Sequence, residues 1–382
     1  MTLILAWKDK HNVFVVADTA VTRRNVSDQS VQDALKKGHL TPTFGEQLQI
    51  SKEKMITEEV LKIHNIKNKL IIGYAGTGVI AIDVINYISE EIDSDFEDRD
   101  LFDIIEEAVK IYGSDFTMAI GVMDDKAPAL FTFNEKKDGK FLDYDEYVPA
   151  ILGNKKDHHV IQDVSNSVVD MFFHGKFKIS PHKKLIMACS LFQGILIRAG
   201  FLSSGVGGLV TGAFLNRNGF NWQKDVMYIK YDFDPEEALK TDDPQIIFPN
   251  GKIIFQLYRE GVLVAFPFDL YKRLEDYKVL YNYVGSLAQN TVTQVFLSEW
   301  RQKYESEIIS QMKRFDFDFL IFLCVDKKAL NKMTFVGKKS ILAGKRLKWV
   351  NGVPTIMISK ELSREINPMF AEHFNQFHWI PD

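Results

Sequence analysis

Few features of this chain restrict its chemistry. Two cysteines occur among 382 residues, Cys189 and Cys324, and neither stands in a CxxC or Cys/His spacing. Both lie in apolar runs, which favours small core residues over a disulfide or a metal site. The charges nearly cancel, since 47 basic and 51 acidic residues give a formal net charge of −4. We therefore expect neither a metal or other cofactor nor a nucleic-acid partner.

Targeting signals are also missing from the pattern. The first residues lack a charged region followed by an apolar stretch, and no apolar run has the length of a membrane span. We therefore expect no membrane association and a cytoplasmic, reducing setting. The hydrophobic fraction of 46% supports a sizeable core, and the length favours two domains or one enlarged domain.

The most informative residue is Thr2, which removal of Met1 would expose as the N-terminus. A threonine there carries a hydroxyl nucleophile and an α-amine base on one residue. Apolar segments that predict strands follow it, and each ends in polar or small residues. In chain order, the segments are residues 2–7, 13–17, Asp18-Thr19-Ala20-Val21-Thr22, Lys62-Ile63-His64-Asn65-Ile66 and Leu70-Ile71-Ile72-Gly73-Tyr74-Ala75-Gly76.

In this order, the segments resemble the proteasome β-subunits and their simpler bacterial relatives, which are N-terminal-nucleophile (Ntn) hydrolases. The resemblance covers roughly residues 2–220. It implies an α+β fold, the four-layer αββα sandwich, in which two antiparallel sheets pack face to face and helices cover both outer sides. It also implies a homo-oligomeric ring, and it leaves open whether an ATPase partner exists.

The remaining pattern divides the chain into two expected regions. Residues 1–222 would form the Ntn-hydrolase domain, with a long polar insertion at about 23–59, and residues 223–382 an α+β extension of unknown role. Apolar periodicity predicts helices and strands along both regions. The expected helices are 78–92, 101–112, 160–173, 183–199 and 295–312, and the later expected strands are 116–123, 129–134, 141–147, 209–215, 226–233, 246–248, 253–257, 262–266, 319–325 and 354–359.

The resemblance also implies roles for particular residues. Thr2 would be the nucleophile, Lys62 the positive group that keeps its amine neutral, and Asp18 the carboxylate that holds Lys62. The backbone amide of Gly73 would stabilise the oxyanion, since a residue without a Cβ lets substrate approach closely. Taken alone, Asp18 would more often be a turn residue and Lys62 a solvated charge.

Substrate contacts are expected around the same positions. By the resemblance, Thr22 would bind the substrate backbone, and Val21 and Ala75 would line an apolar first pocket. The substrate would be a peptide or another amide. The bond it cleaves cannot be read from the sequence.

Several positions depart from the family pattern, among them Ala20, where a basic residue is often found. Asn154 stands where the family has a serine, and Ser203 and Val206 stand where an aspartate and a serine are expected. Asn154 could still orient the amine through water, although it has no hydroxyl proton to relay. An alternative is therefore a catalytically inactive structural or binding protein. A third reading places the activity in the C-terminal region.

Overall fold

The computed structural model gives a description of most of the chain, in segments. These are residues 2–24, 27–29, 31–32, 54–58, 60–92, 98–123, 127–153, 179–199, 205–233, 251–259, 262–269, 282–286, 294–314, 316–326, 332–338, 347–350, 353–356 and 377–380.

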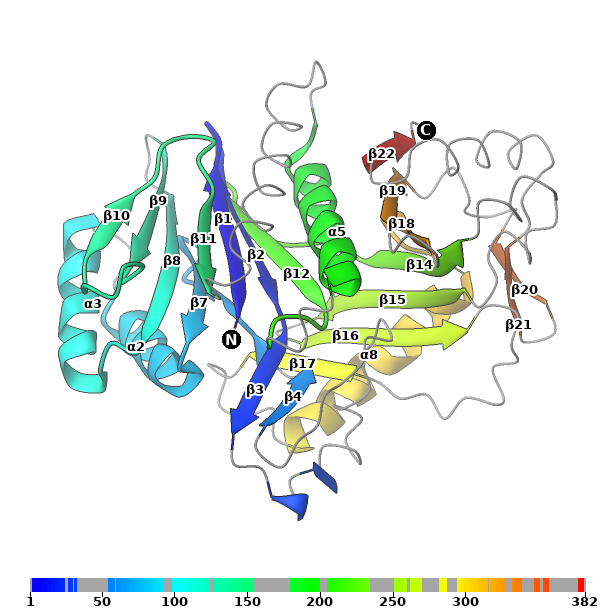
Figure 1. The fold of residues 1–382 in the computed structure, drawn as a ribbon, viewed down its shortest axis with the longest axis horizontal. Helices are drawn as coiled ribbons and strands as arrows, with labels where there is room; N and C mark the ends of the chain where they lie inside the picture. Colours follow the sequence, from blue (N-terminus) through cyan, green and yellow to red (C-terminus); the bar gives the residue numbers. More distant parts are fainter. Residues whose placement is uncertain are drawn as a thin grey trace.

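Two five-stranded sheets lie face to face in the N-terminal half (Figure 1). The first has the order β11-β1-β2-β12-β13, with β11 (Ala150–Gly153), β1 (Leu3–Lys8), β2 (Asn12–Asp18), β12 (Val210–Asn216) and β13 (Gly219–Trp222). The second has the order β10-β9-β8-β7-β6, with β10 (Phe141–Asp143), β9 (Pro128–Phe133), β8 (Phe116–Met123), β7 (Leu70–Gly76) and β6 (Ile63–Ile66). Neighbouring strands within both sheets run antiparallel.

The two sheets share a core of small and branched side chains. Alternate residues of β2, such as Val13 and Val15, face alternate residues of β7, such as Ile71 and Ala75. Burial of this apolar area is the main stabilising term for the pair of sheets. The close packing also explains Gly121, where an added Cβ would lie 2.5 Å from Ile71.

Helices pack on the outer faces of both sheets. The second sheet is covered by α2 (Gly78–Glu91) and α3 (Asp98–Tyr112), through a cluster that includes Leu70, Ile85 and Leu101. The first sheet is covered by α5 (Pro181–Ala199), and Leu185 of this helix belongs to the same core cluster as Phe14 of β2.

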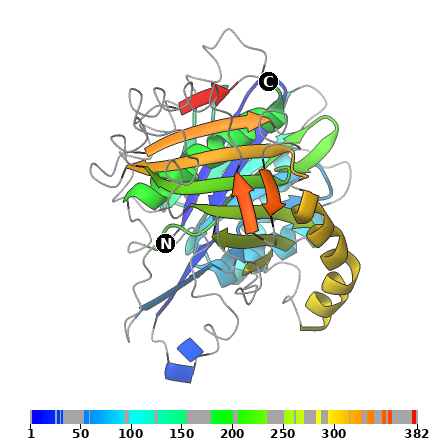
Figure 2. The same cartoon turned by 90° about the vertical axis from the view of Figure 1, so that its right-hand side faces the viewer.

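An eight-stranded sheet forms a third large unit, and its strands run across the direction of β1 and β2 (Figures 1 and 2). Its order is β22-β19-β18-β14-β15-β16-β17-β5. The strands are β22 (Phe377–Ile380), β19 (Lys332–Lys338), β18 (Phe319–Asp326), β14 (Val226–Phe233), β15 (Lys252–Arg259), β16 (Val262–Asp269), β17 (Asn282–Ser286) and β5 (Val60–Leu61). Helix α8 (Gln294–Arg314) connects the β17 and β18 regions. Two further pairs are β3 (Ala20–Arg24) with β4 (Lys54–Glu58), and β20 (Leu347–Val350) with β21 (Val353–Ile356).

The predicted four-layer αββα sandwich is wrong. The described part of the chain is mostly β-sheet, with several antiparallel sheets and four helices, and a sandwich rich in helices is not evident. The physical reason lies in α5. One side of α5 covers the first sheet, but its other side packs on the eight-stranded sheet, where Ile186 lies in one cluster with Tyr228 and Ile254, so α5 is not an outermost layer. The apolar C-terminal strands therefore form a large sheet of their own.

Many individual elements agree with the periodicity of the sequence. Helices α2, α3, α5 and α8 occur where they are expected, as do the first two strands and β7, β8, β12, β14 and β18. The strand expected at 141–147 is shorter, since β10 ends at Asp143. β15 pairs with β16 in a hairpin that turns after Arg259. The expected helix at 160–173 and strand at 246–248 lie outside the described residues.

Among the described helices, none combines the length and apolar character needed to cross a membrane.

Candidate active site

Thr2 lies at the start of β1, where the chain is almost closed off from solvent. Thr2 is 6% exposed. The next residue, Leu3, pairs with Gly153 at the end of β11. Gly153 has a φ of +121°, and a Cβ on it would lie 1.7 Å from the Thr2 carbonyl oxygen. The Thr2 backbone therefore needs glycine at position 153.

Replacing Gly153 by alanine should displace the Thr2 backbone. We expect a loss of about 2–3 kcal/mol in the free energy of unfolding, from the positive φ and the overlap together. Gly139 is a matched control, because it also has a positive φ of +69° but nothing lies within 4 Å of its added Cβ. Gly139→Ala should cost about 1 kcal/mol. Urea unfolding of both variants makes the comparison, and equal losses would contradict the contact with Thr2.

Asp18 is buried at the end of β2 and accepts three hydrogen bonds. Oδ1 accepts the backbone amide of Leu3 at 2.9 Å and the ammonium of Lys62 at 2.7 Å. Oδ2 accepts the amide of Gly207 at 3.0 Å. Since Leu3 and Lys62 share one oxygen, the ammonium lies next to the peptide that joins Thr2 to Leu3. Asp18 is thus more than a turn residue.

Lys62 is buried between β5 and β6, with 2% of the residue exposed. Besides Asp18, its Nζ donates to the carbonyl oxygen of Ala20 at 2.6 Å. Burial lowers the pKa of Lys62 below its ordinary value, against the opposing attraction of Asp18. The ammonium is therefore held by two acceptors. Lys62 is not the solvated charge that a lysine more often is. The structure brings together Asp18, Lys62 and the start of β1, as the sequence predicts.

Two aromatic side chains lie near this pair. The rings of His64 and Tyr74 are 5.6 Å apart, and both residues are buried. Burial, together with the charge of Asp18, raises the pKa of Tyr74. Burial lowers the pKa of His64 to about 4, so it is neutral at pH 7. These residues were not singled out from the sequence, because their ring types are common in cores.

The predicted role of Gly73 as oxyanion donor remains a prediction, and the structure gives this glycine a packing reason. Its added Cβ would lie 2.8 Å from Val15, in the core between the sheets. The backbone amide of Tyr74 donates to the backbone carbonyl oxygen of Lys62, on the β6 side, at 3.2 Å. Since successive amides of a strand point to opposite sides, that of Gly73 points toward β8.

The same alternation identifies Gly76 as a second candidate donor. Its amide points to the side of Lys62, beyond Gly73, where the register with β6 ends. Gly76 is exposed and has a φ of +112°. By the orientation of its amide and by its exposure, Gly76 therefore suits an oxyanion donor better than Gly73.

The three expected substrate-binding residues do not form one cluster. Val21 packs against the core under α2 and α3, whereas Ala75 belongs to the core between the two sheets. Thr22 is half-buried on β3, and its hydroxyl has no hydrogen-bond partner among the described residues. Asn154 and Ser203 lie outside the described residues, so their roles remain predictions.

The segment around Gly207 supports Asp18 through its backbone. The family pattern has an aspartate and a serine at the positions of Ser203 and Val206. Val206, in place of the serine, is buried in the core beneath α5. The amide of Gly207 supplies a hydrogen bond to Asp18 that no side-chain motif could have revealed.

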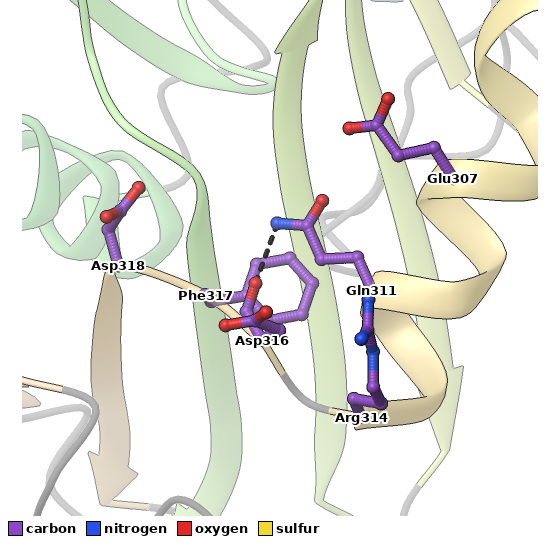
Figure 3. A pocket seen from close by; sticks show the side chains of 6 residues that line it. All are labelled: Glu307, Gln311, Arg314, Asp316, Phe317 and Asp318. Atoms are coloured by element: carbon purple, nitrogen blue, oxygen red, sulfur yellow. Dashed lines mark hydrogen bonds between the residues drawn. The ribbon is translucent and has the colours of Figure 1, made fainter.

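A pocket of about 330 Å³ lies elsewhere, at the C-terminal end of α8 (Figure 3). One of its lining residues, Gln311, donates to the carbonyl oxygen of Asp316 at 2.7 Å. The lining residues are Glu307, Gln311, Arg314, Asp316, Phe317 and Asp318. None of them belongs to the Thr2 group, and they include no hydroxyl or thiol nucleophile. Within the described segments, no group of three or more His, Cys, Asp or Glu side chains could hold a metal ion.

A scan against models of known protein families finds no match, and a search of curated proteins finds no relative. Function therefore has to be argued from the geometry of this site.

Proposed function

We propose that the chain is a threonine-type hydrolase of the N-terminal-nucleophile class, which cleaves a peptide or another amide bond after Met1 is removed. The observation that carries the proposal is the buried Lys62–Asp18 pair beside the start of β1, with Nζ and Oδ1 2.7 Å apart. A buried lysine needs a strong reason to be retained, since burial of a charge is costly. We expect this chemistry to take place in the cytoplasm. Cys189 is a buried free thiol, as is common in a reducing compartment.

In the proposed mechanism, the Thr2 hydroxyl attacks the carbonyl carbon of the substrate while the Thr2 α-amine takes its proton. A free α-amine has a pKa of about 7.7–8. The Lys62 ammonium lowers that value by like-charge repulsion, which favours the neutral base near pH 7. The tetrahedral oxyanion would be stabilised by a backbone amide at the end of β7, from Gly73 or Gly76.

Collapse of this intermediate breaks the C–N bond. The α-ammonium returns its proton to the leaving amine, and the acyl group remains as an ester on Thr2. Water activated by the same amine then attacks the ester and releases the acid. Each step uses only groups of this chain, the substrate and water.

The direct test is the intact mass of the native protein before and after treatment with a threonine-directed electrophile, an epoxyketone or a β-lactone. We expect the loss of one methionine and the addition of one inhibitor mass on Thr2. Thr2→Ala should remove the adduct completely, whereas Thr132→Ala, on β9, should retain it and so shows that labelling is specific for position 2. Retention of Met1, or a free Thr2 that no such electrophile labels, would favour the non-catalytic alternative.

A further inference from the structure

The eight-stranded sheet contacts the segments that hold both members of the Lys62–Asp18 pair. At one edge, β5 pairs with β17 in parallel, with Val60 opposite Gly285 and Leu61 opposite Ser286. Lys62 is the next residue after β5. The edge strand β5 of this sheet therefore directly precedes Lys62 in the chain.

A second contact reaches the segment that holds Asp18. Gln256 lies in the middle of β15 and is fully buried. Its Nε2 donates to the carbonyl oxygen of Val210 at 3.0 Å, and Val210 lies opposite Asp18 in the β2–β12 ladder. The side chain of Gln256 thus links the eight-stranded sheet to the first five-stranded sheet, at the level of the carboxylate.

The same segment is also held from α5. Gln193 accepts the amide of Val210 at 2.8 Å and donates to the carbonyl oxygen of Gly208 at 2.9 Å. These bonds fix residues 207–210, and the amide of Gly207 in turn donates to Asp18. A buried glutamine that lacked these partners would cost free energy, so each hydrogen bond specifies one arrangement.

Gln256 does not satisfy all of its own polar atoms. Its Oε1 is buried and has no hydrogen-bond partner among the described residues. An apolar side chain here would leave the buried carbonyl oxygen of Val210 without this donor, which costs free energy. Among the described residues, the bond to Val210 is therefore what this amide contributes.

We propose that Gln256 is a positioning residue, which fixes the Gly207–Val210 segment and thereby the Asp18 carboxylate that orients Lys62. The eight-stranded sheet then helps to position the Lys62–Asp18 pair. This inference rests on the proposed function for its effect on Thr2 chemistry, but its effect on Lys62 stands independently.

The test compares Gln256→Leu with the parent protein by two readouts. The first is the rate of Thr2 labelling by a β-lactone, which we expect to fall about tenfold, the equivalent of one lost hydrogen bond. The second is the pH titration of the Lys62 Nζ resonance in ¹⁵N-lysine-labelled protein, assigned by its absence in Lys62→Arg. A less well held Asp18 attracts Lys62 less, so the titration midpoint should move down.

Gln223→Leu is the matched control. Gln223 is also buried and bonds to β12, where its Oε1 accepts the amide of Gly212 at 3.2 Å. Gly212 lies two residues beyond Val210 and opposite Val16, not Asp18. The same substitution there should leave both readouts unchanged. Urea unfolding of each variant separates positioning from loss of fold, and the unbranched Gln256→Met replaces Gln256→Leu if the latter does not fold.

The outcomes separate the two proposals. An unchanged Lys62 midpoint in Gln256→Leu, or an equal shift in Gln223→Leu, would overturn the positioning role. If the parent protein is never labelled on Thr2 but the Lys62 midpoint moves only in Gln256→Leu, the positioning role holds and the hydrolase proposal fails.

Discussion

Replacing Lys62 by methionine should lower the free energy of unfolding by about 3–5 kcal/mol, because it leaves a buried carboxylate without its positive partner. Asp18 is 1% exposed, so water cannot compensate for the lost ammonium. The amides of Leu3 and Gly207 would still bond to Asp18, but two dipoles replace a full charge poorly. Urea unfolding at pH 7 measures the loss.

Lys184→Met is the matched control for this substitution. Lys184 pairs with Asp9 at 2.7 Å, the same separation as Lys62 and Asp18, but its side chain is 15% exposed. The Asp9 side chain is 7% exposed, and it also accepts hydrogen bonds from the amides of His11 and Asn12 and from the Asn12 side chain, so the control should lose less stability. Equal losses in the two variants would mean that burial does not set the cost at Lys62.

The double variant Asp18→Asn/Lys62→Met tests whether the two charges act as a unit. The double variant leaves no unpaired buried charge. Its loss in the free energy of unfolding should therefore be about 2 kcal/mol smaller than the sum of the losses in the two single variants. Labelling of Thr2 should fall at least about 100-fold in every variant that lacks Lys62, as expected when the group that tunes a base is lost. Labelling that survives in Lys62→Met would assign the lysine a structural role alone.

The sequence predicts this pair better than it predicts the fold. Asp18 and Lys62 are 44 residues apart, and it is the resemblance to the Ntn hydrolases that implies their contact. Their burial could not be inferred, since a lone lysine is usually solvated. The role of Gly207 is less visible still, because a backbone amide leaves no side-chain signature.

The eight-stranded sheet shows where local periodicity stops being informative. The apolar runs of β14 and β18 predict strands, but not that they pair in parallel, with Val226 opposite Phe319. Nor does any local pattern predict that Val60, from the N-terminal part, pairs with Gly285. Pairing of distant strands depends on the packing of whole faces. For this reason the sequence predicts the C-terminal region only as an α+β extension of unknown role.

Lowering the pH from 7 to 4 should destabilise the protein through His64. In the folded state, burial lowers the pKa of His64 from 6.5 to about 4. Below pH 6.5 the unfolded chain therefore binds a proton that the folded chain does not, so stability falls with pH and the loss is complete near pH 4. The shift corresponds to about 3 kcal/mol.

His64→Phe removes this titration while keeping a ring beside Tyr74, whose centroid lies 5.6 Å from that of His64. The parent and the variant should show parallel stability above pH 7, and their urea midpoints should diverge between pH 6.5 and 4. Burial also lowers the pKa of His182, which acts in the same direction. Since His182 is present in both proteins, its contribution cancels in the difference.

The position of His64 connects this acid sensitivity to the candidate site. It lies two residues after Lys62, and both residues are buried, so a proton taken up by His64 places a buried charge in the stretch of chain that holds the lysine. Burial of a charge is costly, and local opening of β6 would return the imidazolium to water. In the parent, Thr2 labelling should therefore decrease on acidification together with stability. In His64→Phe, any remaining decrease should follow protonation of the Thr2 amine alone. Indistinguishable stability curves for the two proteins down to pH 4 would show that His64 takes up its proton without cost, in conflict with its burial against Tyr74.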